Sequence, residues 1–242
     1  DLHSFPTRRS SDLLSLSFKE QSGLYVKSLT GELTANRRQA KLLNLACVLP
    51  ATSISFGPIK ATYAFNGSEF QSPSLQFNGT MQRSKLTLAD LACFLPELKK
   101  STKPFFLQAD VSGTSTSVRV KTLEISSREN KFSLQANGSI SNWTSKLRWV
   151  TTIKRLRVSA EGVQFLSDNF ANHFQVPPII GRLGNIDYIG EAGGYGKDVA
   201  TKGIIRTDAG TATVAFGKHN NNFSGRELNR SEERRVGKEC RS

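Results

Sequence analysis

The stretch LTLADLACFLPELKKSTKPFFLQADVSG, residues 86–113, holds the two patterns on which the fold depends. In its first half, leucines recur at spacings of three and four, which predicts a short helix with one apolar side. Pro96 lies inside this pattern and should break or kink the helix. In the second half, apolar residues occupy every other position: Phe105, Leu107, Ala109 and Val111. This alternation predicts a strand with one apolar face.

The same alternation recurs along most of the chain, and few helical patterns interrupt it. We expect the alternating residues to line one apolar face: Leu75, Phe77, Phe105, Leu107, Ala109, Val111, Val118, Val120, Phe132, Leu134, Ala136, Ala212, Val214 and Phe216. One helix is predicted over AEGVQFLSDNF, residues 160–170, with Ser159 as its N-cap. Strands and glycines return over residues 183–216. The fold class is therefore mainly β, with too few helices to cover the sheet.

Three Asn-Gly dipeptides each follow an alternating run, at 66–67, 78–79 and 137–138. Asn-Gly between apolar runs is a strong hairpin signal. All three also fit the Asn-x-Ser/Thr pattern, but we interpret Asn66, Asn78 and Asn137 as turn residues rather than as glycan acceptors. The segments LLNLACVLP (42–50) and LADLACFLP (88–96) resemble each other at an offset of 46 positions. This predicts a repeated, elongated β architecture.

One DNA sequence, read in opposite orientations, can encode both ends of the chain. Residues 230–242 can be encoded by a DNA string whose reverse complement encodes residues 1–13. We interpret both segments as a translated sequencing adapter and exclude them from the fold. The remaining residues, 14–229, are expected to be a fragment of a longer protein. They form one unit or two sub-segments, 14–142 and 143–229.

The composition of the chain favours an anionic partner. The chain has 33 Lys and Arg against 20 Asp and Glu; the terminal segments hold seven and five of these, which leaves 26 and 15 and a net charge of +11. Nucleic acid, lipid headgroups or an acidic polymer would match this charge. Cys47 and Cys93 lie in apolar surroundings and are predicted to be free thiols, although a disulfide between them stays open. No stretch is apolar enough to predict a membrane-spanning helix.

The sequence offers no catalytic pattern, and we predict neither an enzyme nor a cofactor. His173 and His219 have no carboxylate or cysteine at a metal-ligand spacing. The glycines at 190, 193, 194 and 196 are interpreted as strand kinks or bulges rather than a phosphate-binding loop. The stretch KLRWVTTIKRLR, residues 146–157, could bind nucleic acid through Trp149 and its arginines. Its alternation equally fits an exposed strand, and we favour that interpretation.

Four stretches resemble the middle and later parts of TamB-like proteins of the AsmA/TamB group: residues 16–33, 58–65, 88–99 and 161–170. The most specific stretch is RLGNIDYIGEAGGYGKDVATKGIIRTDAGTATVAF, residues 182–216. The resemblance implies an elongated, curled, antiparallel-rich sheet that forms an open groove with an apolar interior. It also implies a periplasmic protein of Gram-negative bacteria, anchored to the inner membrane through a segment missing here. The implied function is phospholipid movement toward the outer membrane, or assembly of outer-membrane proteins with a barrel partner that missing regions would contact.

Three hypotheses follow for function. The first is a groove that carries phospholipid acyl chains, which need only a continuous apolar path, since each buried methylene contributes roughly 0.8 kcal/mol. The second is an assembly scaffold or chaperone that offers strand edges to unfolded outer-membrane strands. The third is a closed β-sandwich or solenoid that binds an envelope polysaccharide. Nucleic acid and a small-molecule substrate are not expected.

Overall fold

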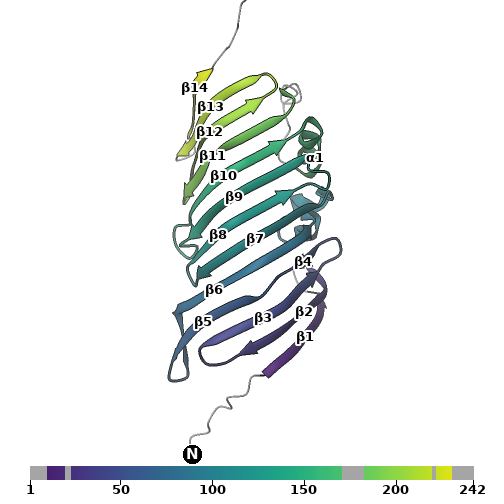
Figure 1. The fold of residues 1–242 in the computed structure, drawn as a ribbon, viewed down its shortest axis with the longest axis vertical. Helices are drawn as coiled ribbons and strands as arrows, with labels where there is room; N and C mark the ends of the chain where they lie inside the picture. The colour runs from purple at the N-terminus through teal and green to yellow at the C-terminus, as the bar shows by residue number, and fades with distance from the viewer. Residues whose placement is uncertain (1–9, 20–22, 171–182, 220–221, 231–242) are drawn as a thin grey trace, which may run out of the picture.

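A computed structural model describes residues 10–19, 23–170, 183–219 and 222–230. Its main feature is one 14-stranded sheet in which every pairing is antiparallel (Figure 1). The strands are β1 (Ser10–Lys19), β2 (Tyr25–Ala35), β3 (Gln39–Val48), β4 (Ser53–Ser55), β5 (Ile59–Asn66), β6 (Glu69–Leu86), β7 (Phe105–Thr114), β8 (Ser117–Ser126), β9 (Phe132–Ser141), β10 (Arg148–Val158), β11 (Ile186–Tyr195), β12 (Asp198–Thr207), β13 (Gly210–His219) and β14 (Asn222–Arg230).

The strands follow one another across the sheet almost in chain order. The only departure is next to β3. There β5 pairs with the first half of β3 and β4 with its second half, and both short strands pair with β6 on their other side. The strands stack along the long axis of the molecule (Figure 1). The predicted fold class is confirmed: the chain is mainly β and forms an elongated, curled, open antiparallel sheet. A closed sandwich or solenoid, the architecture of the third hypothesis, is not what the chain forms.

The leucine pattern that precedes β7 forms two short turns instead of one helix. These are the 3-10 helices η1 (Leu88–Leu91) and η2 (Pro96–Lys100). The predicted break at Pro96 is confirmed, because this residue begins η2. Proline lacks the N–H that a continuing helix requires and is tolerated in a first turn.

The predicted helix is confirmed as α1 (Ala160–Phe170). Its predicted N-cap is also confirmed, since the Gly162 N–H donates to Ser159 Oγ at 3.1 Å. A capped N-terminus fixes where the chain leaves β10, so that α1 turns back over the end of the strands it follows.

Two predictions from local sequence are wrong. Asn66-Gly67 does form the turn between β5 and β6, with Gly67 at φ 61°. In contrast, Asn78-Gly79 lies inside β6 and Asn137-Gly138 lies inside β9, each paired with neighbouring strands on both sides. Ladder hydrogen bonds to two neighbours outweigh the local preference for a turn, because residues inside the sheet satisfy both backbone groups.

The predicted repeat is also wrong in structural terms. Residues 42–48 belong to β3, whereas the matching residues 88–94 form η1 and the turn after it. Similar apolar composition therefore gives a strand in one place and a 3-10 helix in the other. The difference lies in the pairing partners, since β3 has neighbours on both sides.

Of the two terminal segments, a few residues lie within the described structure. Ser10 to Leu13 extend β1 and pair with residues 32–35, and Arg230 ends β14 opposite Ala212. We expect deletion of residues 1–13 and 230–242 to leave the melting temperature unchanged, because the rest of β1 keeps its pairing with β2. Thermal melts of the trimmed and full chains test this, and a fall of several degrees would contradict the adapter interpretation.

Candidate functional site: an uncovered apolar face

The strand register gathers the predicted apolar residues on one side of the sheet. Residues that lie directly opposite each other on antiparallel strands point to the same side of the sheet. Residues that pair in succession from strand to strand therefore form a row on one face. One row runs from β7 to β13: Leu107, Ile125, Leu134, Leu156, Tyr188, Ile205 and Ala212. We call the side that carries this row the apolar face.

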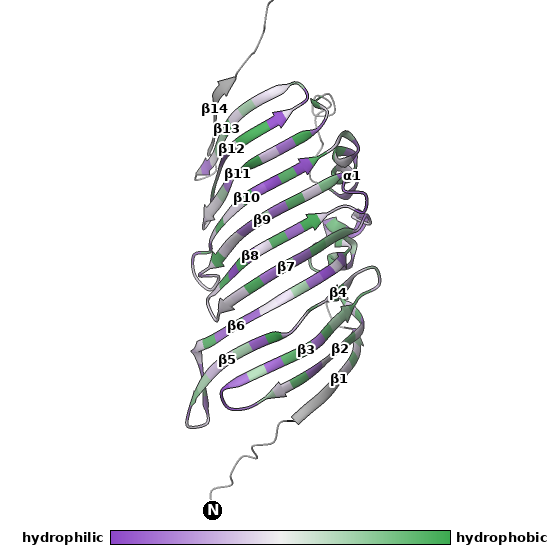
Figure 2. Cartoon of the chain, viewed as in Figure 1, coloured by the Kyte–Doolittle hydropathy of each residue, from purple (hydrophilic) through white to green (hydrophobic). Residues whose placement is uncertain are grey.

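Three further rows from β6 lie on the same face. The first is Phe77, Gly113, Val118, Ile140, Trp149, Gly194 and Val199. The second is Gly79, Val111, Val120, Gly138, Thr151, Ala192, Thr201 and Phe216. The third is Met81, Ala109, Leu123, Ala136, Ile153, Gly190, Gly203 and Val214. From β6 to β12 none of the residues in these four rows is charged; on β13 the ladder partner of Val199 is Lys218, which ends the row that begins at Phe77. Figure 2 shows the resulting alternation of hydropathy along the strands.

The rows contain nearly all of the predicted site residues. Phe105 and Phe132 join the same face at the end of the sheet next to α1, where Phe105 pairs with Leu86 and Phe132 with Val158. Leu75 is the exception: it lies in the irregular part of β6 between Gln71 and Gln76 and has no ladder partner. The register therefore does not assign Leu75 to the face.

The apolar face is shielded only in part. In β12 its residues are mostly half-buried, whereas the residues of the opposite face are mostly exposed. On β12 the apolar face is therefore the more shielded side of the sheet. The fully buried apolar residues among those described are nevertheless few: Val26, Leu49, Phe105, Ala109, Ala136 and Val158. On this face Ile140 and Phe216 remain 43% and 42% exposed.

At one end the chain covers its own apolar face. Phe105 is 7% exposed, and its ring centroid lies 5.0 Å from that of Phe165 and 6.4 Å from that of Phe170, both on α1. Phe132 is 5.9 Å from Phe105. Edge-to-face contacts of this kind favour a closed core. The helix therefore makes a small aromatic core over the ends of β7, β9 and β10, and the rest of the face extends beyond it.

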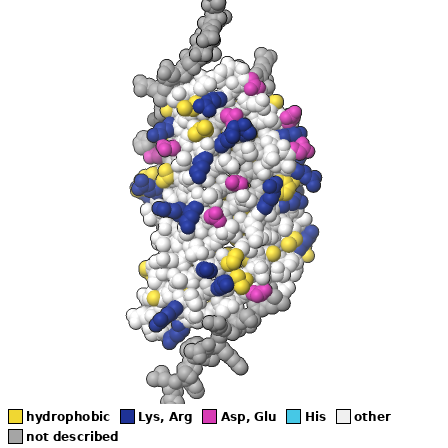
Figure 3. Space-filling view, in the orientation of Figure 1, with side chains coloured by type: hydrophobic (Ala, Val, Ile, Leu, Met, Phe, Trp, Pro, Cys, Tyr) yellow, Lys and Arg dark blue, Asp and Glu magenta, His cyan; other side chains and the backbone are white. Residues whose placement is uncertain are grey.

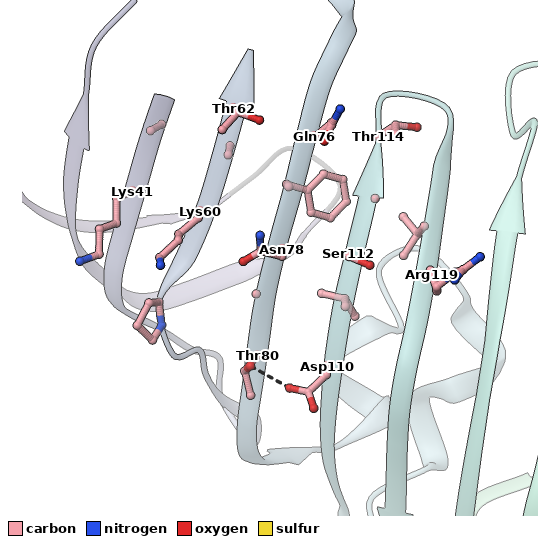
Figure 4. Close-up of a pocket in the computed structure, with 18 of the residues that line it drawn as sticks. Lys41, Lys60, Thr62, Gln76, Asn78, Thr80, Asp110, Ser112, Thr114 and Arg119 are labelled. Carbon is pink, nitrogen blue, oxygen red and sulfur yellow. Dashed lines mark hydrogen bonds between the residues drawn. The ribbon is translucent and has the colours of Figure 1, made fainter. Parts of the chain in front are cut away.

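The opposite side of the sheet, the polar face, is hollowed. A hollow of about 1400 Å³ lies over β3, β5, β6, β7 and β8. Its side chains include the cross-strand row Lys41, Lys60, Asn78, Ser112, Arg119 and Ser139 (Figure 4). Figure 3 looks onto this face, where Lys and Arg side chains are spread over much of the surface.

The one acidic residue in the lining of this hollow is already engaged. Asp110 accepts hydrogen bonds from Thr80 Oγ1 at 2.7 Å and from Thr122 Oγ1 at 2.9 Å (Figure 4). These bonds, together with the charge of Lys121, lower the pKa of the Asp110 carboxyl. The carboxylate thus stays ionised and is held beside its hydroxyl donors.

The stretch considered for nucleic-acid binding divides between the two faces. Trp149 lies on the apolar face, as the row above shows, whereas Arg155 and Arg157 lie opposite it and bind Asp187 Oδ1 through their Nε atoms, each at 3.2 Å. A base stacked on Trp149 would therefore lie across the sheet from these arginines. The predicted exposed strand is confirmed as β10.

Both cysteines in the described chain are free thiols. Cys47 lies on β3 opposite Leu29 and Ile54, on the apolar face, and burial raises the pKa of its thiol. Cys93 lies between η1 and η2. The position of Cys47 makes it a natural reporter of whatever occupies the face.

The described residues contain no group of three or more His, Cys, Asp or Glu that could hold a metal ion. His173 lies outside the described residues. No helix among the residues placed by the structure is long and apolar enough to cross a membrane.

Comparison with known proteins gives no relative. No protein-family model, curated protein or solved structure matches the chain.

Proposed function

We propose that the protein carries phospholipid acyl chains along its apolar face. The observation that supports this is the apolar face itself. Its four rows carry no charged residue from β7 to β12, and the described chain covers the face only at one end. An apolar area of this extent in a folded protein marks a place where something else binds. Acyl chains fit such a face because they need burial without any directional contact.

The proposal extends to family and place in the cell. A member of the AsmA/TamB group would work in the periplasm, between the inner membrane that anchors it and the outer membrane. Movement of lipid along a sheet requires neither a catalytic group nor a cofactor, and we propose that the protein is not an enzyme. The polar face would then lie in water while the acyl chains follow the other side.

Native mass spectrometry of the purified protein tests this function. The expected result is a set of species heavier than the protein by the mass of one or more phospholipids, which collisional activation releases. Lipid extraction and identification from the same preparation serve as the check on identity. A preparation that is free of lipid, and that takes up none from phospholipid vesicles, would overturn the proposal.

A second candidate function rests on the edges of the sheet. Within the described chain, β1 and β14 each pair on one side only. An unpaired edge offers backbone hydrogen-bonding groups to another strand, as a scaffold for outer-membrane strands would require. Capture of an unfolded barrel segment by a lipid-free protein would favour this function over the first.

Cys47 gives a direct test of occupancy. We expect alkylation of Cys47 to slow severalfold when phospholipid is bound, because acyl chains on the apolar face would exclude the reagent. Cys93 is the internal control, since it lies outside the strands and its rate should not change. In the lipid-free protein the rate at Cys47 should keep rising with pH beyond the range of an ordinary thiol, because the raised pKa delays formation of the thiolate. Equal rates at Cys47 with and without lipid would count against acyl chains on this face.

A further inference from the structure

The hollow of the polar face contains an unusual arrangement of charge. Lys41 on β3 and Lys60 on β5 are direct cross-strand partners. Their Cβ atoms are therefore about 5 Å apart on the same face. Like charges directly opposite each other destabilise a sheet. Both side chains are exposed, so an anion from solution can reach the pair and compensate for the repulsion.

No acidic side chain within the described residues forms an ion pair with either lysine. Neither Lys41, Lys60 nor Arg119 takes part in an ion pair there, whereas Lys202 and Arg157 elsewhere on the same face are paired with Glu191 and Asp187. Asp110, the only acid in the lining, accepts hydrogen bonds from two threonines and supplies one negative charge. The lining holds four cations, Lys41, Lys60, Arg119 and Lys121, so the hollow has an excess of positive charge.

The arrangement of the row indicates the kind of anion. Two adjacent lysines match the charge of a phosphate monoester, which carries about −1.5 to −2 at neutral pH; a single carboxylate would leave one lysine uncompensated. Arg119 lies three strands beyond Lys60, about 14 Å away at 4.7–4.9 Å per strand. Asn78 and Ser112 lie between them in the same row and offer hydrogen bonds to hydroxyl groups.

Other polyanions fit less well. The only aromatic residue in the lining is Phe77, which belongs to the apolar face. The hollow therefore lacks the aromatic platforms on which single-stranded nucleic acids stack their bases. A bilayer surface is flat, whereas the cations here line a recess.

We propose that this hollow binds a phosphorylated glycan, with one phosphate between Lys41 and Lys60, a second near Arg119 and sugar hydroxyls at Asn78 and Ser112. The site lies across the sheet from the apolar face, and it does not depend on the lipid function.

Binding of a phosphomannan whose phosphates are monoesters, with the same mannan after phosphatase treatment as the comparison, tests the proposal. We expect the full chain to bind phosphomannan at low ionic strength and to lose at least tenfold in affinity when Lys41→Gln and Lys60→Gln are combined. The charge-matched control combines Lys202→Gln and Arg206→Gln on β12, outside the hollow, and should stay within about twofold of the unaltered protein. Arg119→Gln alone should give an intermediate loss.

The stability of the double variant adds a second readout. Because K41Q/K60Q removes a like-charge contact, its melting temperature should rise, so a loss of affinity cannot be attributed to unfolding. The proposal is overturned by equal losses in the two double variants, by equal binding of phosphorylated and dephosphorylated mannan, or by tighter binding of single-stranded DNA or of anionic phospholipid vesicles. Loss of lipid binding in an apolar-face variant that still binds phosphomannan would separate the two functions.

Discussion

Leu134→Arg should abolish phospholipid binding while the protein still folds. Leu134 is half-buried and is the third residue of β9, in the row that joins Ile125 to Leu156 across the apolar face. Its side chain points away from the backbone ladder, so the substitution leaves strand pairing intact. An arginine there places a charge in the path of an acyl chain, and an unpaired charge in apolar surroundings costs several kcal/mol. Leu107→Asp, in the same row on β7, should act in the same way.

Gln135→Arg is the matched control for this substitution. Gln135 is the next residue of β9, is exposed on the polar face and lies opposite Glu124. The same added charge on the other side of the same strand should leave lipid binding unchanged. Native mass spectrometry and vesicle uptake give the binding, and circular dichroism with thermal melts gives the folding. If Leu134→Arg destroys the β signal while Gln135→Arg does not, the apolar face is an ordinary structural core and the lipid proposal fails.

Phe105→Ala should greatly reduce the folding stability, which Leu134→Arg should leave largely unchanged. Phe105 is buried under α1 against Phe132, Phe165 and Phe170. Truncating a buried phenylalanine removes its transfer free energy and leaves a cavity, which typically costs about 3–5 kcal/mol. Few apolar side chains among the described residues are fully buried, so the unfolding free energy should fall by this amount.

Phe106→Ala is the control, because Phe106 is the adjacent residue on the polar face. It is half-buried and carries Arg83 at 5.4 Å from its ring centroid. We expect a much smaller loss of stability from this variant. Urea unfolding of both variants measures the difference, and similar midpoints for the two would show that α1 does not close a core over Phe105.

The sequence predicted the fold class and the main members of the apolar face because side-chain alternation is a local property of a strand. Leu156 was missed as a member of the face. In β10 the spacing from Ile153 to Leu156 is three residues rather than two, and the structure shows a register shift at that point. At a bulge, two residues of one strand lie opposite one residue of the neighbouring strand, which shifts the alternation by one position. The sequence of one strand alone does not show where this happens.

The placement of Asn78, Asn137 and the polar hollow could not be predicted for a related reason. Turn propensity is read from a dipeptide, whereas membership of a strand depends on two partners that are distant in sequence. Lys41 and Lys60 are 19 positions apart, and β5 reaches β3 only because β4 ends after three residues. Lys41 and Lys60 become partners only because β5 pairs with β3 beyond the end of β4. No local pattern in the sequence predicts this pairing.

The order of strands in the sheet has a consequence for size. Nearly every strand pairs with the strands that precede and follow it in the chain. Inserting one more hairpin would therefore lengthen the molecule without rearranging the rest. Each added strand extends the sheet by about 4.8 Å in the hydrogen-bonding direction. The length of such a protein is therefore set by the number of its hairpins.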